Sequence, residues 1–179
     1  MKYNNIEFEA IVATPGCGKS YLCDKYPNLF VDVDEVRLKC KYIVPQNVTR
    51  QELEATKGNR PYPRRAKHNE YIADLYRKLD EYTKQGKTLI AALHPEAIDY
   101  LINNNIKFCF VYADKDMRQE ITRRLTVRGN SSDVVKENDD LFETFYNGNI
   151  NENKSVVHYA FKKDEYLEDI IKKFGYTKI

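Results

Sequence analysis

The chain has 179 residues, of which 42% are hydrophobic and 31% are charged, and its formal net charge at pH 7 is +2. This length suits one globular domain, and a nearly neutral chain has no general basic field for nucleic acid, so any basic patch must be local. No apolar run approaches the roughly 20 residues that cross a bilayer, and the start MKYNNIEFEA lacks the apolar segment of a secretory signal. We therefore expect a single cytoplasmic domain over residues 1–179 with no membrane partner.

Apolar runs of strand length alternate along the chain with stretches of helical period. The strand-like runs span residues 8–13, 29–33, 88–93, 107–113 and 155–161. Two other stretches, 72–79 and 167–174, place apolar residues at the i, i+3, i+4, i+7 spacing of a helix that packs on one face. This alternation predicts an α/β fold, in which helices cover a mainly parallel sheet.

The sequence ATPGCGKS, at residues 13–20, follows the first strand-like run and opens a stretch that can continue as a helix. Such a turn directs successive backbone N–H groups at a phosphate, and the helix N-terminus adds its positive dipole end. Gly16 and Gly18 permit the positive φ angles that the turn requires. In the pattern GxxxxGK[ST], Lys19 reaches the β and γ phosphates and the Ser20 hydroxyl binds magnesium. The first glycine of that pattern is replaced by Ala13, which removes no ligand.

The pattern therefore predicts a phosphate-binding loop (P-loop) for ATP and Mg²⁺. The expected nucleotide-binding residues are Ala13, Thr14, Pro15, Gly16, Cys17, Gly18, Lys19 and Ser20. A glycine turn without a ligand is the alternative.

Acidic residues end the second strand-like run, in FVDVDEVR at residues 30–37. Ligands of an open α/β sheet bind beyond the carboxyl ends of its strands, so these acids should face the same crevice as the loop at 13–20. Asp32 and Asp34 should point to one side, because strand side chains alternate. We expect Asp32 to support magnesium and Asp34 to orient or deprotonate an acceptor. The alternative for Asp34 is a cap on the next helix.

A P-loop followed by a DxD pattern at the end of the next strand resembles the small-molecule and nucleotide kinases of the P-loop class, such as shikimate and gluconate kinases. The order DVDEVR, at residues 32–37, is also similar to the phage polynucleotide 5′-kinase pattern. In that pattern an Asp serves as base and an Arg three residues later holds a nucleic-acid phosphate. The resemblance places these roles on Asp34 and Arg37. A mechanical ATPase is disfavoured, because no second strand-like run ends in a similar acidic pair.

A basic segment follows the fourth strand-like run. Its RLxxRG pattern, Arg124 to Gly129, precedes polar residues and another helical stretch, and it is similar to the lid of nucleoside monophosphate kinases. This resemblance implies a lid over residues 124–140, in which Arg124 contacts the transferring phosphates and Arg128 the ATP base or phosphates. Arg123 is expected to face solvent or to pair with a neighbour such as Glu120. The alternative is a basic helix face without a ligand.

Positive charge for an acceptor phosphate is expected outside the lid. Residues 41–65, with prolines at 45, 61 and 63, predict an irregular insertion that binds the acceptor. The candidates are Arg37, Arg60, Arg64 and Arg65. Tyr62 either stacks on a base or packs against the sheet. His94, which ends the third strand-like run, either touches the acceptor or a phosphate or is a turn histidine bonded to backbone.

Three further stretches, FVDVDE at 30–35, LIAALHPEAIDYL at 89–101 and DEYLEDII at 164–171, resemble phage-encoded P-loop proteins, many of them called nucleotide kinases. These resemblances imply a P-loop nucleoside triphosphate hydrolase fold with a five-stranded sheet in the order 2-3-1-4-5. They also imply transfer of the ATP γ-phosphate to a small molecule, a (deoxy)nucleoside monophosphate. Two alternatives stay open: a kinase for a hydroxyl group on a polynucleotide 5′ end or a small metabolite, and a non-catalytic ATP-binding switch that regulates a partner.

Overall fold

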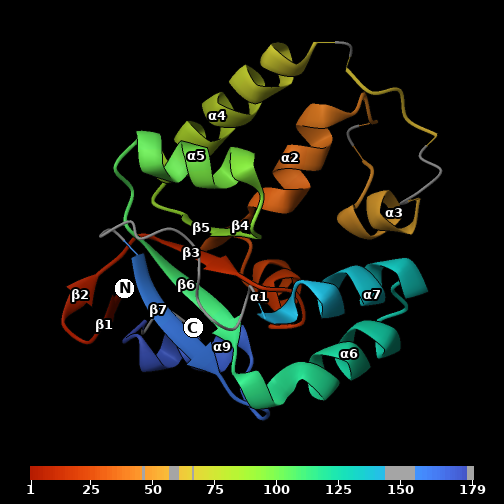
Figure 1. Cartoon of the computed structure of the whole chain (residues 1–179). Helices are drawn as coiled ribbons and strands as arrows, with labels where there is room; N and C mark the ends of the chain where they lie inside the picture. The colour runs from red at the N-terminus through yellow and green to blue at the C-terminus, as the bar shows by residue number, and fades with distance from the viewer. Residues whose placement is uncertain (46, 57–60, 66, 144–155, 177–179) are drawn as a thin grey trace.

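The computed structural model describes residues 1–45, 47–56, 61–65, 67–143 and 156–176 (Figure 1). A central sheet has the strand order β4-β5-β3-β6-β7, and every ladder between its neighbouring strands is parallel. The strands are β3 (Ala10–Ala13), β4 (Phe30–Asp32), β5 (Thr88–Ala91), β6 (Phe108–Ala113) and β7 (Val156–Phe161). The predicted α/β class, with a five-stranded parallel sheet flanked by helices, is confirmed.

Helices cover both faces of this sheet (Figure 1). One face packs against α2 (Val33–Lys41), α4 (His68–Lys84) and α5 (Pro95–Asn103). The other packs against α1 (Lys19–Lys25), α6 (Arg118–Val127) and α9 (Leu167–Lys173). The remaining elements are the hairpin of β1 (Lys2–Tyr3) and β2 (Ile6–Glu7), the short helix α3 (Arg50–Ala55), the 3₁₀ helix η1 (Lys115–Met117) and α7 (Ser132–Asp140).

The sequence of the central strand β3 is continuously apolar because its side chains pack on both faces of the sheet. Ile11 and Ala13 belong to the core with α1, α6 and α9, whereas Ala10 and Val12 belong to the core with α2, α4 and α5. Successive strand side chains point to opposite faces, and both faces of this parallel sheet are covered. All four residues of β3 are therefore buried.

The helical spacing at 72–79 and 167–174 corresponds to helices in the structure. Helix α4 buries Leu75 and Leu79 on the side that faces the sheet. Helix α9 begins at Leu167 and buries Ile170 and Ile171. Both sequence predictions are confirmed. Among the described helices, none combines the length and the apolar character needed to span a membrane.

The predicted insertion over 41–65 is mostly irregular where the structure describes it. Its two ends lie together, since the Ile43 N–H donates to the Pro63 carbonyl at 2.9 Å and the Arg65 N–H donates to the Lys41 carbonyl at 3.0 Å. Between them lies α3, whose Leu53 is buried in a small cluster with Leu38 of α2. The insertion is therefore tied to α2. Arg60, one of the acceptor candidates, lies outside the described residues.

Candidate functional site

The loop between β3 and α1 carries the glycine conformations that the sequence motif requires. Gly16 has φ 80° and Gly18 has φ 94°, in the left-handed region that glycine adopts without strain. Space is restricted as well, because a Cβ on Gly16 would lie 3.1 Å from Ile121 Cδ1 of α6. The loop therefore turns tightly against α6.

Side chains of this loop divide between the core and the surface. The Cys17 side chain is completely buried in the core on the α1 side of the sheet, and Ala13 and Thr14 are buried too. Lys19 Nζ donates to the Ala13 carbonyl at 2.8 Å and to the Thr14 carbonyl at 3.0 Å. A ligand at this loop would thus meet backbone groups and the Lys19 ammonium rather than the Cys17 thiol.

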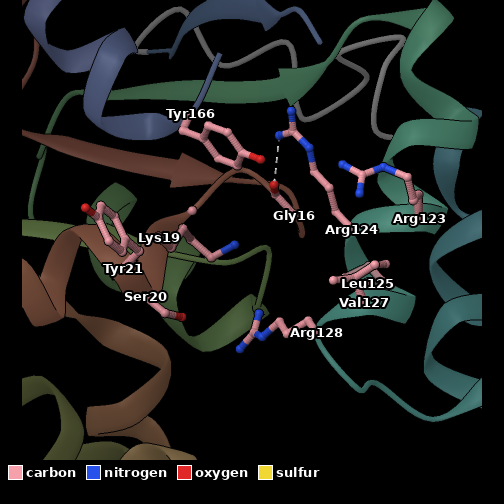
Figure 2. A pocket seen from close by; sticks show the side chains of 11 residues that line it. Gly16, Lys19, Ser20, Tyr21, Arg123, Arg124, Leu125, Val127, Arg128 and Tyr166 are labelled. Atoms are coloured by element: carbon pink, nitrogen blue, oxygen red, sulfur yellow. Dashed lines mark hydrogen bonds between the residues drawn. The ribbon is translucent and has the colours of Figure 1, made fainter. Parts of the chain in front are cut away.

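A cavity of about 350 Å³ opens beside the loop, a size within the range of small-molecule sites. Its walls are Gly16 and Gly18, the first turn of α1, the end of α6 and Tyr166. Figure 2 shows Arg128 extending from the end of α6 toward Ser20, with Tyr166 on the opposite side. The sequence motif at 13–20 and Arg128 of the predicted lid therefore face the same cavity.

Arg124 lines the same cavity as Arg128, and its guanidinium is engaged by protein groups. Its side chain is buried, with Nε donating to Glu120 Oε1 at 2.8 Å and Nη1 to the Gly16 carbonyl at 3.1 Å. Nη2 donates to the Lys163 carbonyl. The guanidinium also lies over the Tyr166 ring, 4.2 Å from its centroid. All three guanidinium nitrogens thus donate to protein acceptors, whereas the neighbouring Arg123 pairs with Glu120 on the surface, as expected.

Asp32 caps α2, which corrects the alternative that gave this role to Asp34. Asp32 Oδ1 accepts from the N–H of Asp34 at 3.0 Å and of Glu35 at 3.4 Å. Its other oxygen, Oδ2, accepts from Nη1 of the buried Arg50 at 2.5 Å. No local motif predicts this ion pair, because Arg50 lies in the insertion, far from Asp32 in the sequence.

Asp34 is the second residue of α2, so the expected alternation of Asp32 and Asp34 along a strand is wrong, because β4 ends at Asp32. Its Oδ1 accepts from the Ala92 N–H, just beyond β5, at 3.2 Å. Burial raises the pKa of Asp34 to about 6, while the positive charge of Lys19 opposes this rise and the negative charge of Asp32 adds to it. Asp34 is therefore a partly buried carboxyl group, with 17% of its side chain exposed, within the electrostatic reach of Lys19.

His94 and Arg37 meet Asp34 at the same edge. Arg37 Nη2 lies 3.1 Å from His94 Nε2, and that nitrogen is 3.7 Å from Asp34 Oδ1. Burial, reinforced by the charge of Arg37, lowers the pKa of His94 to about 4. The neutral ring then accepts the Arg37 hydrogen bond through Nε2. The alternative that His94 is a turn histidine bonded to backbone holds for its carbonyl group, which accepts from the N–H groups of Ala97 and Ile98 of α5. The His94 side chain contacts Arg37 instead.

Two residues that the sequence did not single out complete this cluster. Glu96 Oε1 lies 3.9 Å from Arg37 Nη1, and it accepts a hydrogen bond of 2.6 Å from the Tyr71 hydroxyl. Glu96 directly follows the motif residues His94 and Pro95, so its position after β5 was the one available signal. Arg37 is thus held between a neutral imidazole and a carboxylate.

Two further acceptor candidates, Arg64 and Arg65, interact with different parts of the fold. Arg64 pairs with Tyr42 as a β-bridge, and its charge acts on the Tyr71 hydroxyl. Arg65 Nη1 is 3.4 Å from Asp74 Oδ2 of α4. Tyr62 packs on the small cluster of α2 and α3, so it packs against the insertion rather than the sheet.

Within the described part of the chain, no three His, Cys, Asp or Glu side chains gather as metal ligands. A magnesium ion held by one hydroxyl, phosphate oxygens and water does not require such a group. Comparison with protein-family models and with curated proteins finds no match for this chain. The site is therefore interpreted from its own geometry.

Replacing Asp32 with Ala is expected to destabilise the fold strongly. The loss of the α2 cap costs about 0.5–2 kcal/mol, and the loss of the charge-assisted hydrogen bond to the buried Arg50, which keeps its 3.6 Å ion pair with Asp24, adds about 1.5–3 kcal/mol. Asp32→Asn is the matched variant, because its amide oxygen can still cap α2 while the charge is lost, and we expect an intermediate loss. Urea denaturation at pH 7 measures both, and a loss under about 1 kcal/mol for Asp32→Ala would contradict this geometry.

Proposed function

We propose that this chain is an ATP-dependent phosphotransferase with a P-loop nucleoside triphosphate hydrolase fold. One observation carries the proposal: the loop with Lys19 follows β3, and the Asp34, Arg37 and His94 cluster follows the neighbouring strands β4 and β5. In a parallel sheet these carboxyl ends share one edge. When the five strands of the central sheet are numbered in chain order, the order β4-β5-β3-β6-β7 becomes 2-3-1-4-5. This order supports the proposed P-loop fold.

The donor nucleotide would bind along the loop at 13–20 and in the adjacent cavity. Backbone N–H groups of the loop and the Lys19 ammonium would hold its phosphates, with Lys19 exchanging the Ala13 and Thr14 carbonyls for a charged partner. The Ser20 hydroxyl and the Asp32 carboxylate are oxygen ligands of the kind that Mg²⁺ prefers, and Asp32 would act through water because both of its oxygens are engaged. Bound Mg²⁺ would neutralise phosphate charge.

Residues 124–140 would form the lid of this site. Arg128 faces the cavity from the end of α6, so it would contact the base or the phosphates of ATP (Figure 2). Phosphoryl transfer depends mainly on positioning and on neutralising charge, which suits an arginine at this place.

The acceptor would be a (deoxy)nucleoside monophosphate, bound at the cluster around Arg37. His94 and Glu96 orient the guanidinium of Arg37, which would receive the acceptor phosphate together with Arg64 and Arg60 of the insertion. Asp34 would orient the acceptor. A monophosphate oxygen carries no proton that must be removed before it attacks.

A hydroxyl acceptor, on a polynucleotide 5′ end or a small metabolite, is the second candidate. The partly buried Asp34 carboxyl favours it, because its pKa of about 6 suits a general base near neutral pH. A hydroxyl must lose a proton as it attacks, so Asp34 would then take part in the chemical step.

Incubation with radiolabelled ATP tests the activity directly. We expect label to appear in a pool of nucleoside monophosphates and not in 5′-hydroxyl oligonucleotides or polyols, and we expect Lys19→Met to lower labelling by on the order of a hundredfold or more. Label in the oligonucleotide or polyol pool would establish the second candidate instead. Slow hydrolysis that no acceptor changes would indicate an ATP-binding switch and contradict the phosphotransferase.

Asp34→Asn separates the two acceptor classes. For a monophosphate acceptor we expect a higher acceptor KM and a kcat within about tenfold of wild type. Loss of nearly all activity would indicate a hydroxyl acceptor, for which the wild-type rate would also fall below pH 6 as Asp34 takes up a proton. Steady-state kinetics from pH 5 to 8 distinguish these outcomes. Glu35→Gln, which alters a neighbouring carboxylate paired with Lys39, is the matched control.

A further inference from the structure

Two consecutive carbonyl groups of the loop at 14–18 are anchored from outside the loop. The Gly16 carbonyl accepts from Arg124 Nη1 at 3.1 Å, the bond drawn dashed in Figure 2. The Cys17 carbonyl accepts from the N–H of Leu167, the first residue of α9, at 2.7 Å. These anchors come from α6 and α9, which lie on the same face of the sheet.

Anchoring a carbonyl also fixes an N–H group. In a trans peptide the C=O and the N–H of the same planar unit point in opposite directions. The carbonyl of Gly16 shares its peptide unit with the N–H of Cys17, and the carbonyl of Cys17 shares its unit with the N–H of Gly18. Arg124 and Leu167 therefore direct two successive N–H groups away from α6 and α9.

The surroundings of Arg124 keep its guanidinium in this position. Glu120 holds Nε from the preceding turn of α6, and the Lys163 carbonyl holds Nη2. The Tyr166 ring stacks on the guanidinium at 4.2 Å. A side chain with 6% exposure and this many contacts has little freedom to leave for a ligand. Its charge also strengthens the bond to the Gly16 carbonyl relative to a neutral donor.

We propose that Arg124 is a positioning residue, which acts with the Leu167 N–H to hold the Cys17 and Gly18 amides in the direction that binds nucleotide phosphates. The proposal rests on the proposed function, because it assigns those amides to ATP. In this role Arg124 supports the loop and does not itself make the contact with the transferring phosphates that the resemblance to a lid implies. Preorganised donors bind an anion without the cost of ordering the loop first.

Tripolyphosphate is the decisive probe, since it engages the loop without needing the base cavity. We expect Arg124→Met to weaken tripolyphosphate and ATP by a similar factor, about tenfold or more, and Arg124→Lys to fall between Arg124→Met and wild type. Arg118 lies on α6, as Arg124 does, and Arg118→Met removes an exposed ion pair with Asp139 of α7. This control should change the affinities for tripolyphosphate and ATP by no more than about twofold. Calorimetry at a temperature where every variant is folded gives these affinities.

A spectroscopic measurement separates positioning from a general loss of structure. In ¹⁵N–¹H spectra without ligand, Arg124→Met should shift the Cys17 and Gly18 amides while leaving the amides of α4, on the other face of the sheet, in place. Unchanged Cys17 and Gly18 signals would overturn the proposal.

A second pair of variants tests the other anchor and decides the matter if Arg124→Met does not fold. Leu167→Pro removes the N–H, and proline is accepted there because Leu167 opens α9 and Tyr166 before it is extended, with φ −117° and ψ 165°. Leu167→Ala loses buried side chain but keeps the N–H. We expect tripolyphosphate to bind about tenfold more weakly to Leu167→Pro than to Leu167→Ala.

The outcomes distinguish this proposal from the proposed function. If wild-type protein binds neither ATP nor tripolyphosphate, both are overturned. If wild type binds them and the variants Arg124→Met and Leu167→Pro bind equally well, the positioning role alone is overturned.

Discussion

The pairing of β3 on both of its edges is the constraint on which the site depends. Parallel ladders to β5 and β6 fix the end of β3 at Ala13, and β5 in turn fixes the end of β4 at Asp32. The carboxyl ends of β3, β4 and β5 therefore lie at the same end of the sheet. The parallel pairing of these strands brings the loop with Lys19, which follows β3, close to the acids at the end of β4.

Charges at this edge are arranged in pairs rather than left to solvent. Arg50 neutralises Asp32, and His94 and Glu96 hold Arg37. Asp34 accepts from the Ala92 N–H and lies near the His94 imidazole, and its burial raises the pKa of its carboxyl group close to Lys19. Lys19 and Arg37 therefore surround Asp34, whose carboxyl group changes protonation near pH 6. Fixed positive groups of this kind can stabilise developing negative charge.

The sequence predicted those features that depend on local pattern. Alternation and helical spacing located the strands and the helices α4 and α9, and ATPGCGKS placed positive φ angles at Gly16 and Gly18. Contacts between distant segments carry no such pattern. Arg124 and the Gly16 carbonyl are 108 residues apart, and Arg37 and His94 are 57 apart. A local motif identifies an arginine near a ligand, but the fold decides whether it contacts that ligand or supports the loop that does.

A crystal structure with Mg²⁺ and a non-hydrolysable ATP analogue would locate the nucleotide relative to the loop at 13–20. We expect the phosphates to lie against the backbone N–H groups of residues 16–20, with Lys19 Nζ moved from the Ala13 and Thr14 carbonyls to the β and γ phosphates. An analogue bound elsewhere, or a loop that stays without a phosphate at saturating analogue, would contradict this expectation.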